Sequence, residues 1–288
     1  MMNMIEKVYT SDRSTWVGDG FKTNSMLPMS EMGTATSPFL VMGYTERYPF
    51  SPSAHQRGVG MHPHRGFETV TIVYEGELEH RDSKGNHGTI GKNEVQWMTA
   101  GRGIMHEEHH SKSFAQSGGH LDMIQLWVNL PSKAKMTEPR YQELTEENIP
   151  EIKLANDEGI VRVIAGEYLN ANKIATGPAK TYSPINLLDV RLNAGKNSQF
   201  SFDPTWNNII FVLSGKVRID GQVFEHLQTV YLTHDVSELE IEVLEDSKLL
   251  IASGEPIYEP IVAHGPFVMN SENEIRQAFV DFQNGHFA

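Results

Sequence analysis

Short segments with alternating apolar and polar residues run along most of the chain. Residues 68–74 are rich in β-branched side chains, and similar runs follow at 77–82, 94–98 and 120–128 after glycine-containing turn signals. Such alternation is typical of strands that bury one face. Strands at this spacing favour a β-sandwich or a small barrel.

The second half of the chain repeats this pattern. Residues 208–219 form a strand–glycine–strand segment in which Gly215 stands where Gly76 stands in the first half. Further strand-like runs lie at 187–192, 229–233, 239–243 and 248–252. We therefore predict an all-β fold of two tandem, related β domains that arose by internal duplication.

The predicted boundary between the domains lies in residues 131–159. This segment contains three prolines and an acidic run at 143–147, which is typical of a linker with one short helical turn. We place the first domain at residues 1–137 and the second at residues 138–288.

The end of the chain has a different, helical period. Ser271 and Glu274 form a capping box, because serine stands at the cap and glutamate three residues later. The apolar residues that follow recur with helical spacing, at Ile275, Ala278, Phe279 and Phe282. We predict an amphipathic helix over residues 271–284 that packs on a barrel.

Composition narrows the possible functions. The formal net charge of −13 repels phosphate backbones, so we expect no direct nucleic-acid binding. The chain has no cysteine, which excludes disulfides, thiolate metal sites and cysteine nucleophiles. No apolar run reaches the ~18 residues of a membrane span, and no apolar leader follows the first methionine. We expect a cytoplasmic monomer without a membrane partner.

Histidine is concentrated in one region. Nine of the 13 histidines lie between His55 and His120. Without thiolates, imidazole and carboxylate are the strong metal ligands that remain. His62 and His64 stand two residues apart, so on a strand both would point to the same face.

A second pair with the same spacing follows. His106 and Glu108 are also two residues apart, and the glycines at 101 and 103 allow a tight corner before them. Two such pairs on neighbouring strands would bring three imidazoles and one carboxylate together. This set leaves positions open on an octahedral ion, as suits iron, manganese, nickel or copper with bound substrate or dioxygen.

The carboxylate ligand has an alternative in Glu68. It lies at an even spacing from His62 and would face the same side if the strand were unbroken, but Gly66 could shift that phase. Spacing does not decide between Glu68 and Glu108. We expect the remaining clustered histidines to lack a role as ligands: His80 and His87 as solvated residues beside a hairpin turn, and His109 and His110 on a mobile loop.

The second half contains no matching histidines. Offsets counted from Gly76 and Gly215 align His62, His64 and Glu68 with Ser201, Asp203 and Asn207, respectively. We therefore expect only the first domain to bind metal.

Three longer motifs resemble the pirin family. They lie at residues 58–71 around His62-Pro63-His64-Arg65-Gly66, at 96–108, and at 264–270 in the C-terminal region. The resemblance implies a bicupin, with two jelly-roll-like barrels and a C-terminal helix. It further implies one metal ion, usually iron, held by His62, His64, His106 and Glu108. A general cupin pattern would use Glu68, so the pirin resemblance favours Glu108.

The resemblance also suggests an activity. Pirins are similar to quercetin 2,3-dioxygenases, which implies a flavonol-like substrate, dioxygen and ferrous iron, with manganese, nickel, copper or zinc as other possible metals. Glu108 would accept the proton of the substrate hydroxyl. An alternative is a metal-containing regulator that acts on a protein partner, as a transcriptional cofactor or a regulator of a metabolic enzyme. A third hypothesis is a zinc-dependent cupin isomerase.

Overall fold

The computed structural model describes residues 3–170 and 173–287. The described chain is mostly β and divides into two compact units. One unit, the first barrel, contains Arg13–Gly33, Leu40–Glu146 and the chain from Ile257 onward. The other, the second barrel, contains the chain up to Asp12, Thr34–Phe39 and Glu147–Pro256. The prediction of an all-β fold with two barrels is confirmed.

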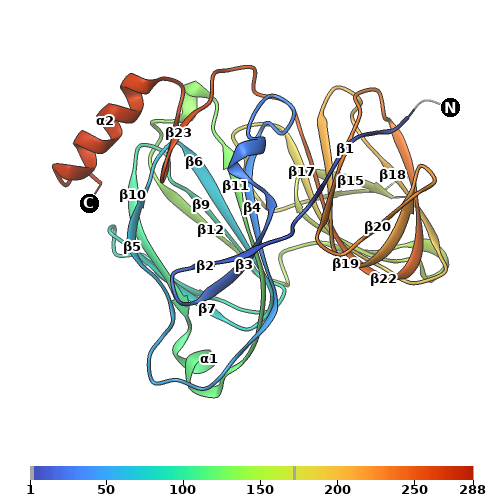
Figure 1. Cartoon of the computed structure of the whole chain (residues 1–288), viewed down its shortest axis with the longest axis horizontal. Coiled ribbons are helices and arrows are strands. Elements are labelled where there is room, and N and C mark those ends of the chain that lie inside the picture. Colours follow the sequence, from blue (N-terminus) through green and yellow to red (C-terminus); the bar gives the residue numbers. More distant parts are fainter. Residues whose placement is uncertain (1–2, 171–172, 288) are drawn as a thin grey trace. The chain divides into compact units, whose positions relative to one another are not determined.

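The first barrel has two antiparallel sheets (Figure 1). A seven-stranded sheet has the order β12-β9-β6-β11-β4-β3-β2, and a four-stranded sheet has the order β5-β10-β7-β8. The strands are β2 (Ser14–Val17), β3 (Phe21–Leu27), β4 (Phe39–Phe50), β5 (Gly58–His64), β6 (Phe67–Glu75), β7 (Leu78–Asp82), β8 (His87–Ile90), β9 (Val95–Thr99), β10 (Ile104–His110), β11 (Gly119–Asn129) and β12 (Arg140–Leu144). A short helix, α1 (Lys112–Ser117), joins β10 to β11.

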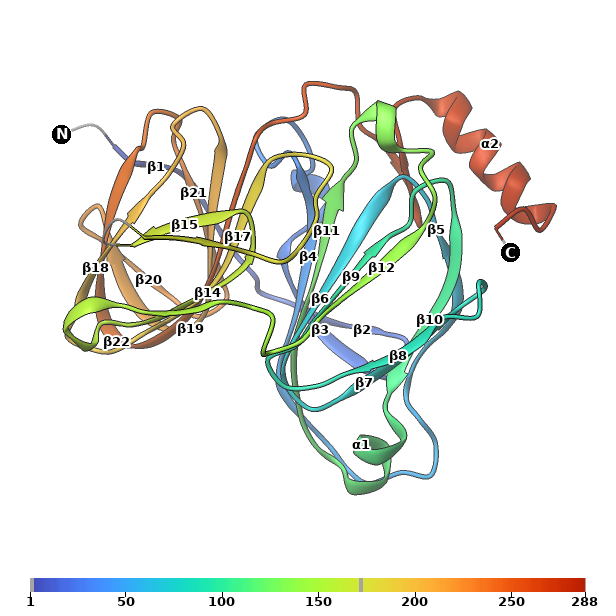
Figure 2. The same ribbon diagram turned by 180° about the vertical axis from the view of Figure 1, so that it is seen from behind.

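The second barrel forms a nine-stranded sheet with the path β1-β21-β19-β22-β17-β14-β13, to which β18 and β20 add at β22 and β19 (Figure 2). Its strands are β1 (Ile5–Thr10), β13 (Glu151–Lys153), β14 (Gly159–Ala165), β17 (Ile185–Leu192), β18 (Asn197–Ser201), β19 (Asn207–Ile219), β20 (Gln222–Glu225), β21 (Gln228–Leu232) and β22 (Glu238–Gly254). A separate hairpin contains β15 (Glu167–Asn170) and β16 (Lys173–Thr176). The inward side chains form one apolar core.

The two barrels share one connectivity. Six strands of each large sheet can be ranked by their order along the chain. In the first barrel, the neighbouring strands β9-β6-β11-β4-β3-β2 then have the ranks 5-4-6-3-2-1. In the second barrel, β21-β19-β22-β17-β14-β13 have the same sequence of ranks. The order β5-β10-β7-β8 of the smaller sheet also recurs. Its counterpart in the second barrel is β18, the start of β22, the end of β19, and β20. This match supports the predicted duplication.

The unit boundaries differ from the predicted division at residue 137. β1 pairs with β21 from Thr10 to Ile5, so the start of the chain belongs to the second barrel. The C-terminal region belongs to the first barrel, because Phe267, Met269 and Ile275 share an apolar cluster with Met105 of β10. Each end of the chain therefore belongs to the barrel formed mainly by the other half of the sequence. A division at one sequence position does not reveal this.

The predicted linker is also more ordered than expected. Besides short 3-10 turns at Ser132–Ala134 and Ala155–Asp157, it contains β12 and β13, each of which extends a sheet. β12 pairs with β9, and β13 pairs with β14. The segment therefore supplies an edge strand to each barrel.

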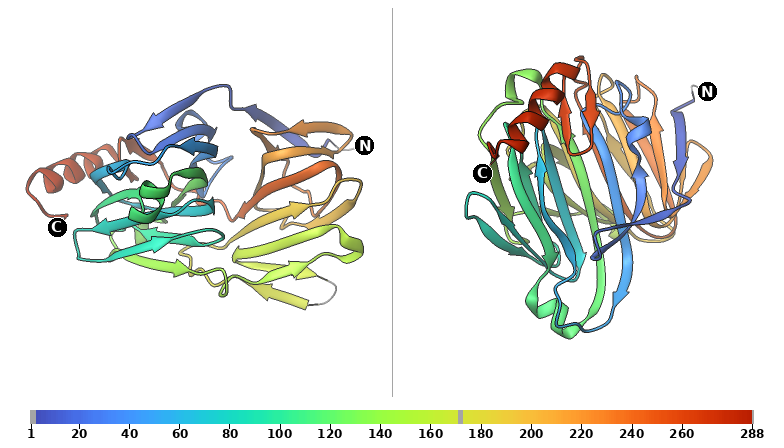
Figure 3. Two further views of the ribbon diagram at one scale, coloured as in Figure 1. Left: turned by 90° about the horizontal axis from the view of Figure 1, so that it is seen from below. Right: turned by 60° about the vertical axis from the view of Figure 1, so that its left-hand side comes forward.

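The C-terminal helix α2 (Glu272–Gln283) begins at the predicted cap. Ser271 Oγ accepts a hydrogen bond from the Glu274 backbone N–H at 3.3 Å and donates one to Glu274 Oε2 at 2.9 Å. Its buried face contains Ile275 and Ala278 and lies against the hairpin β23 (Val262–His264) and β24 (Phe267–Met269) (Figure 3).

Candidate metal centre

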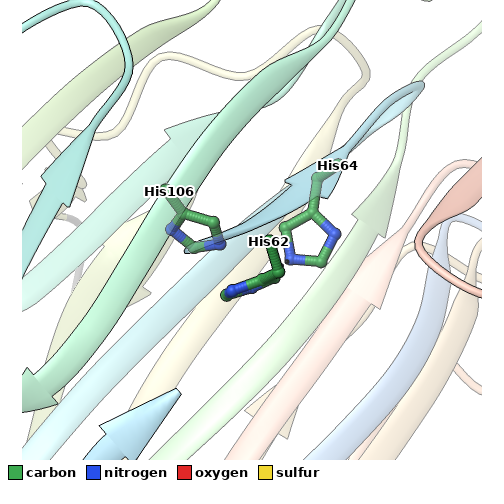
Figure 4. A group of neighbouring side chains, drawn as sticks. All are labelled: His62, His64 and His106. Carbon is green, nitrogen blue, oxygen red and sulfur yellow. Dashed lines mark hydrogen bonds between the residues drawn. The ribbon is translucent and has the colours of Figure 1, made fainter. Parts of the chain in front are cut away.

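Three histidines gather between β5 and β10. His62 and His64 lie on β5 and His106 on β10, and one nitrogen of each ring lies within 4.8 Å of the others (Figure 4). The strands pair antiparallel with His106 opposite His62, so strand pairing places the two pairs of the sequence motif side by side. In the described part of the chain, this is the one group of three or more potential metal-ligating side chains at such distances.

Strand alternation points the side chains of β10 inward. Ile104, His106, Glu108 and His110 are buried, whereas the residues between them are partly exposed. The prediction that His106 and Glu108 face the same side is therefore confirmed. A bulge in the β5–β10 pairing separates them, because two steps along β10 match three along β5.

Burial keeps His64 and His106 neutral. It lowers the pKa of His64 to about 3 and the pKa of His106 well below its usual value, with a further lowering from the neighbouring imidazoles. Neutral imidazole keeps the lone pair that a metal ion requires.

The geometry of the rings fits a divalent transition metal. His62 Nε2 and His64 Nε2 are 3.1 Å apart. Two imidazole nitrogens that bind one ion at right angles, each at a bond length of about 2.1 Å, would lie about 3.0 Å apart. Neither ring nitrogen of His106 has a hydrogen-bond partner among the described residues, although the side chain is fully buried. An unpaired buried polar group is costly, and a cation would satisfy it.

Glu108 lies beside the three histidines but outside the group of mutually close ligand atoms. Its Oε2 accepts a hydrogen bond of 2.9 Å from Gln125 Nε2, and Gln125 Oε1 accepts one of 3.3 Å from Trp127 Nε1. Burial raises the pKa of the Glu108 carboxyl, while His62 and Gln125 partly oppose that shift. Gln125 therefore orients the Glu108 carboxylate. The sequence signal that could have identified Gln125 is a polar residue at a position of β11 that faces the cavity.

Glu68 points to the other face of its strand. On β6 it has the opposite parity to Thr71, whose side chain interacts with Glu108. Its carboxylate instead accepts a hydrogen bond of 2.6 Å from Thr99 Oγ1, and burial raises its pKa to about 7. The phase shift that Gly66 made possible is real, since this glycine has a φ of +88°.

A cavity of about 260 Å³ opens beside the histidines. His62, His64 and Glu108 form its polar wall. Its other walls are mostly apolar and come from β2, β3, β4, β5, β7 and β11, with the lining residues Val17, Phe21, Thr23, Val41, Gly43, Thr45, Val59, Leu78, Met123, Gln125 and Trp127. Trp127 stacks on Phe67 with ring centroids 4.3 Å apart, which fixes the wall next to His64.

Three other histidines differ from their predicted positions. His80 is 3% exposed rather than solvated, because β7 directs it inward, where it contacts Gln96 and stacks on Tyr141. His109 and His110 belong to β10 rather than to a mobile loop, and the ring of His110 lies 4.4 Å from that of Phe50. The prediction for His87, which is exposed, is confirmed.

The fold and the three-histidine group define the class of protein: a bicupin with a potential metal centre in its first barrel. Family models for Pirin and for the Pirin C-terminal cupin domain match residues 20–128 and 187–288. The chain belongs to the pirin family.

Relatives extend over the whole chain. A Pseudomonas aeruginosa protein named "Putative quercetin 2,3-dioxygenase PA2418" is 46% identical over 286 residues, which cover 99% of each chain. Pirin from Homo sapiens is 40% identical over 77% of this chain and 75% of its own length. The crystal structure of a quercetin 2,3-dioxygenase from Acinetobacter baumannii matches with a TM-score of 0.96 and 43% identity, covering 100% of this chain and 99% of that one.

The helices give one further finding. Within residues 3–170 and 173–287, none is long and apolar enough to cross a membrane.

Proposed function

We propose that this protein is a metal-dependent dioxygenase of the quercetin 2,3-dioxygenase type, with ferrous iron as its metal. The observation that carries the proposal is the convergence of three imidazoles, two of which line an apolar cavity. The names of the Pseudomonas aeruginosa and Acinetobacter baumannii relatives support this type of reaction.

The proposed ligands are His62, His64, His106 and Glu108. Three nitrogen donors and one carboxylate suit iron, and manganese, nickel, copper or zinc could also bind such a set. The bound ion would supply Lewis acidity toward substrate oxygens and redox chemistry toward dioxygen. A rotation of the Glu108 side chain toward the histidines would complete the set.

The chain's own groups would bind the substrate and handle its proton. A flavonol-like molecule would place its flat rings against the apolar walls and its oxygens toward His62 and His64. Glu108 would accept the proton of the substrate hydroxyl at its carboxylate in its present position, where Gln125 Nε2 donates a hydrogen bond to the Oε2 atom. Phe21, Leu78 and Met123 would exclude water from the reacting atoms.

The decisive experiment loads the full chain with ferrous iron under anaerobic conditions and then adds quercetin and dioxygen. We expect the flavonol absorbance to disappear, with one mole of carbon monoxide released for each mole of flavonol consumed. His62→Ala should abolish both, whereas His226→Ala, which changes an exposed histidine of the second barrel, should leave both unchanged. Full turnover by the His62→Ala variant would refute the site.

A fully loaded chain without turnover would refute the dioxygenase proposal. It would favour the alternative of a metal-containing regulator, for which a pull-down compared between ferrous and ferric protein is the test. A partner retained by one oxidation state alone would support that alternative.

A further inference from the structure

The second barrel contains a cavity in the place that corresponds to the metal centre. In the first barrel, His62 lies opposite His106 across the β5–β10 pair. In the second barrel, Phe200 lies opposite Leu239 across the matching pair of β18 and β22. The pairing therefore matches His62 with Phe200, one position before the Ser201 expected from sequence offsets.

The other wall of the cavity has the same correspondence. Trp127 pairs with Thr69 in the first barrel, and Ser253 pairs with Asn208 at the matching position in the second. Two residues earlier, Gln125 corresponds to Ile251. Gln125, Trp127, Ile251 and Ser253 all line the cavity of their own barrel.

Every proposed ligand position is apolar in the second barrel. Phe202 follows Phe200 by two residues as His64 follows His62, while Leu239 and Ile241 stand in the places of His106 and Glu108. Phe200, Leu239 and Ile241 are almost fully buried. The cavity is nevertheless about 330 Å³, which is no smaller than its counterpart of about 260 Å³. This volume lies at the lower end of the range of small-molecule sites.

The hairpin β15–β16 extends this cavity with exposed apolar side chains. Leu169 and Ile174 are paired directly opposite each other and are 59% and 63% exposed. Both line the cavity together with Tyr168, whose ring lies 6.2 Å from that of Phe200. A ligand in the cavity would cover these two side chains and gain hydrophobic free energy.

The polar groups of the lining restrict the charge of a ligand. Among the described residues around the cavity, Glu167 is the one charged side chain. Without a cation to offset it, the site disfavours carboxylates, sulfonates and phosphates. Asn186 and Ser253 offer hydrogen-bonding groups at one side.

We propose that the second barrel is a metal-free binding site for an uncharged, flat aromatic molecule. The ligand would lie among the rings of Tyr168, Phe200 and Phe202, against Leu188 and Ile251, and under the hairpin residues Leu169 and Ile174. Aromatic contacts of this kind are favourable for a flat ring system. The site does not depend on the metal or the reaction of the first barrel.

The test uses the full-length chain with labelled isoleucine, leucine and valine methyl groups. N-phenyl-1-naphthylamine, an uncharged aromatic probe, should produce saturable NMR shifts at Leu188 and Ile251. Its anionic analogue 1-anilinonaphthalene-8-sulfonate should bind there at least about tenfold more weakly. Shifts confined to Val41 and Leu78 of the first cavity, absence of a saturable shift, or equal affinity for both probes would overturn the proposal.

Two variants and a control complete the experiment. Leu188→Phe fills the cavity and should weaken probe binding about tenfold. The double change Leu169→Ser and Ile174→Ser alters exposed side chains, so the chain should fold normally but bind the probe several-fold more weakly. Val41→Phe fills the first cavity and should leave the Leu188 and Ile251 shifts unchanged. If the hairpin variant bound with unchanged affinity, the proposed site would be wrong.

Discussion

The first and second barrels use one backbone plan for two different interiors. Where the first presents His62 and His106 from paired strands, the second presents Phe200 and Leu239 from the matching pair. Strand alternation directs these positions inward in both barrels. The residue type then determines whether the interior contains metal-ligating imidazoles or apolar side chains. A few substitutions at inward positions are therefore enough to separate a potential metal centre from a hydrophobic core.

The largest expected effect is the loss of the metal centre. His106→Ala should lower metal affinity at least about 100-fold, because it removes one of three converging imidazoles. Leu239→Ala, at the matching position of the second barrel, should leave metal affinity unchanged. Anaerobic calorimetric titration of both variants with a divalent metal measures this difference. Equal affinities would contradict the separation of roles.

The reverse contrast concerns packing. Phe200→Ala should lower the free energy of unfolding by about 3–4 kcal/mol, because the ring is 2% exposed within the second core. Metal affinity should not change. Urea denaturation of the metal-free chain, followed by tryptophan fluorescence and circular dichroism, gives the stability change. A change below 1 kcal/mol would mean that the ring is not packed as described.

The barrels should also differ in acid sensitivity. Burial lowers the pKa of His80 to about 4, whereas Ile219 occupies the matching position of the second barrel. Between pH ~6.5 and 4, this histidine is therefore protonated in the unfolded chain but neutral in the folded chain. The free energy of unfolding consequently falls as the pH drops through this range. The loss should be about 1 kcal/mol per pH unit.

His80→Ile should remove this part of the pH dependence. The measurement is the difference in unfolding free energy between the original chain and the variant at pH 7.5, 6 and 5, which cancels the carboxylates common to both. A constant difference across this range would show that His80 is protonated equally in both states.

The smallest expected effect lies at the cap of α2, an element that the first barrel has and that the described residues of the second barrel do not form. Ser271→Ala removes the hydrogen bond to the Glu274 N–H and should cost about 1 kcal/mol. Ser271→Asp should retain most of that stability, because aspartate caps as well. A thermal melt that distinguishes neither variant from the original chain would show that the helix does not contribute to cooperative unfolding.

Local sequence patterns predicted much of this architecture. The period-two runs identified the strands, and the paired spacing at His62 and His106 identified the three clustered histidines. They could not decide the side of the sheet for Glu68, because that depends on the left-handed backbone at Gly66. Nor could they show that His80 beside a turn is buried, because its burial depends on the pairing of β7 with β10.

Long-range pairing accounts for the remaining differences. The aligned position of His62 was displaced by one residue because His62 precedes Thr69 by seven positions, whereas Phe200 precedes Asn208, the counterpart of Thr69, by eight. The exchanged ends of the chain depend on the partners of β1 and α2, which no local period reveals. Register and packing partners are properties of the folded chain.

The buried ion pair between Arg65 and Asp281 has a consequence for synthesis. Arg65 Nη1 donates to Asp281 Oδ2 at 2.8 Å, its guanidinium lies 4.5 Å from the Phe287 ring, and it directly follows His64. The two charged residues are 216 positions apart, so a ribosome adding ~5–20 residues per second needs about 10–40 s between them. Throughout that interval Arg65 lacks its carboxylate, and the first barrel emerges from the ribosome before the residues that close it. Its last contacts must wait until Asp281 has been synthesised.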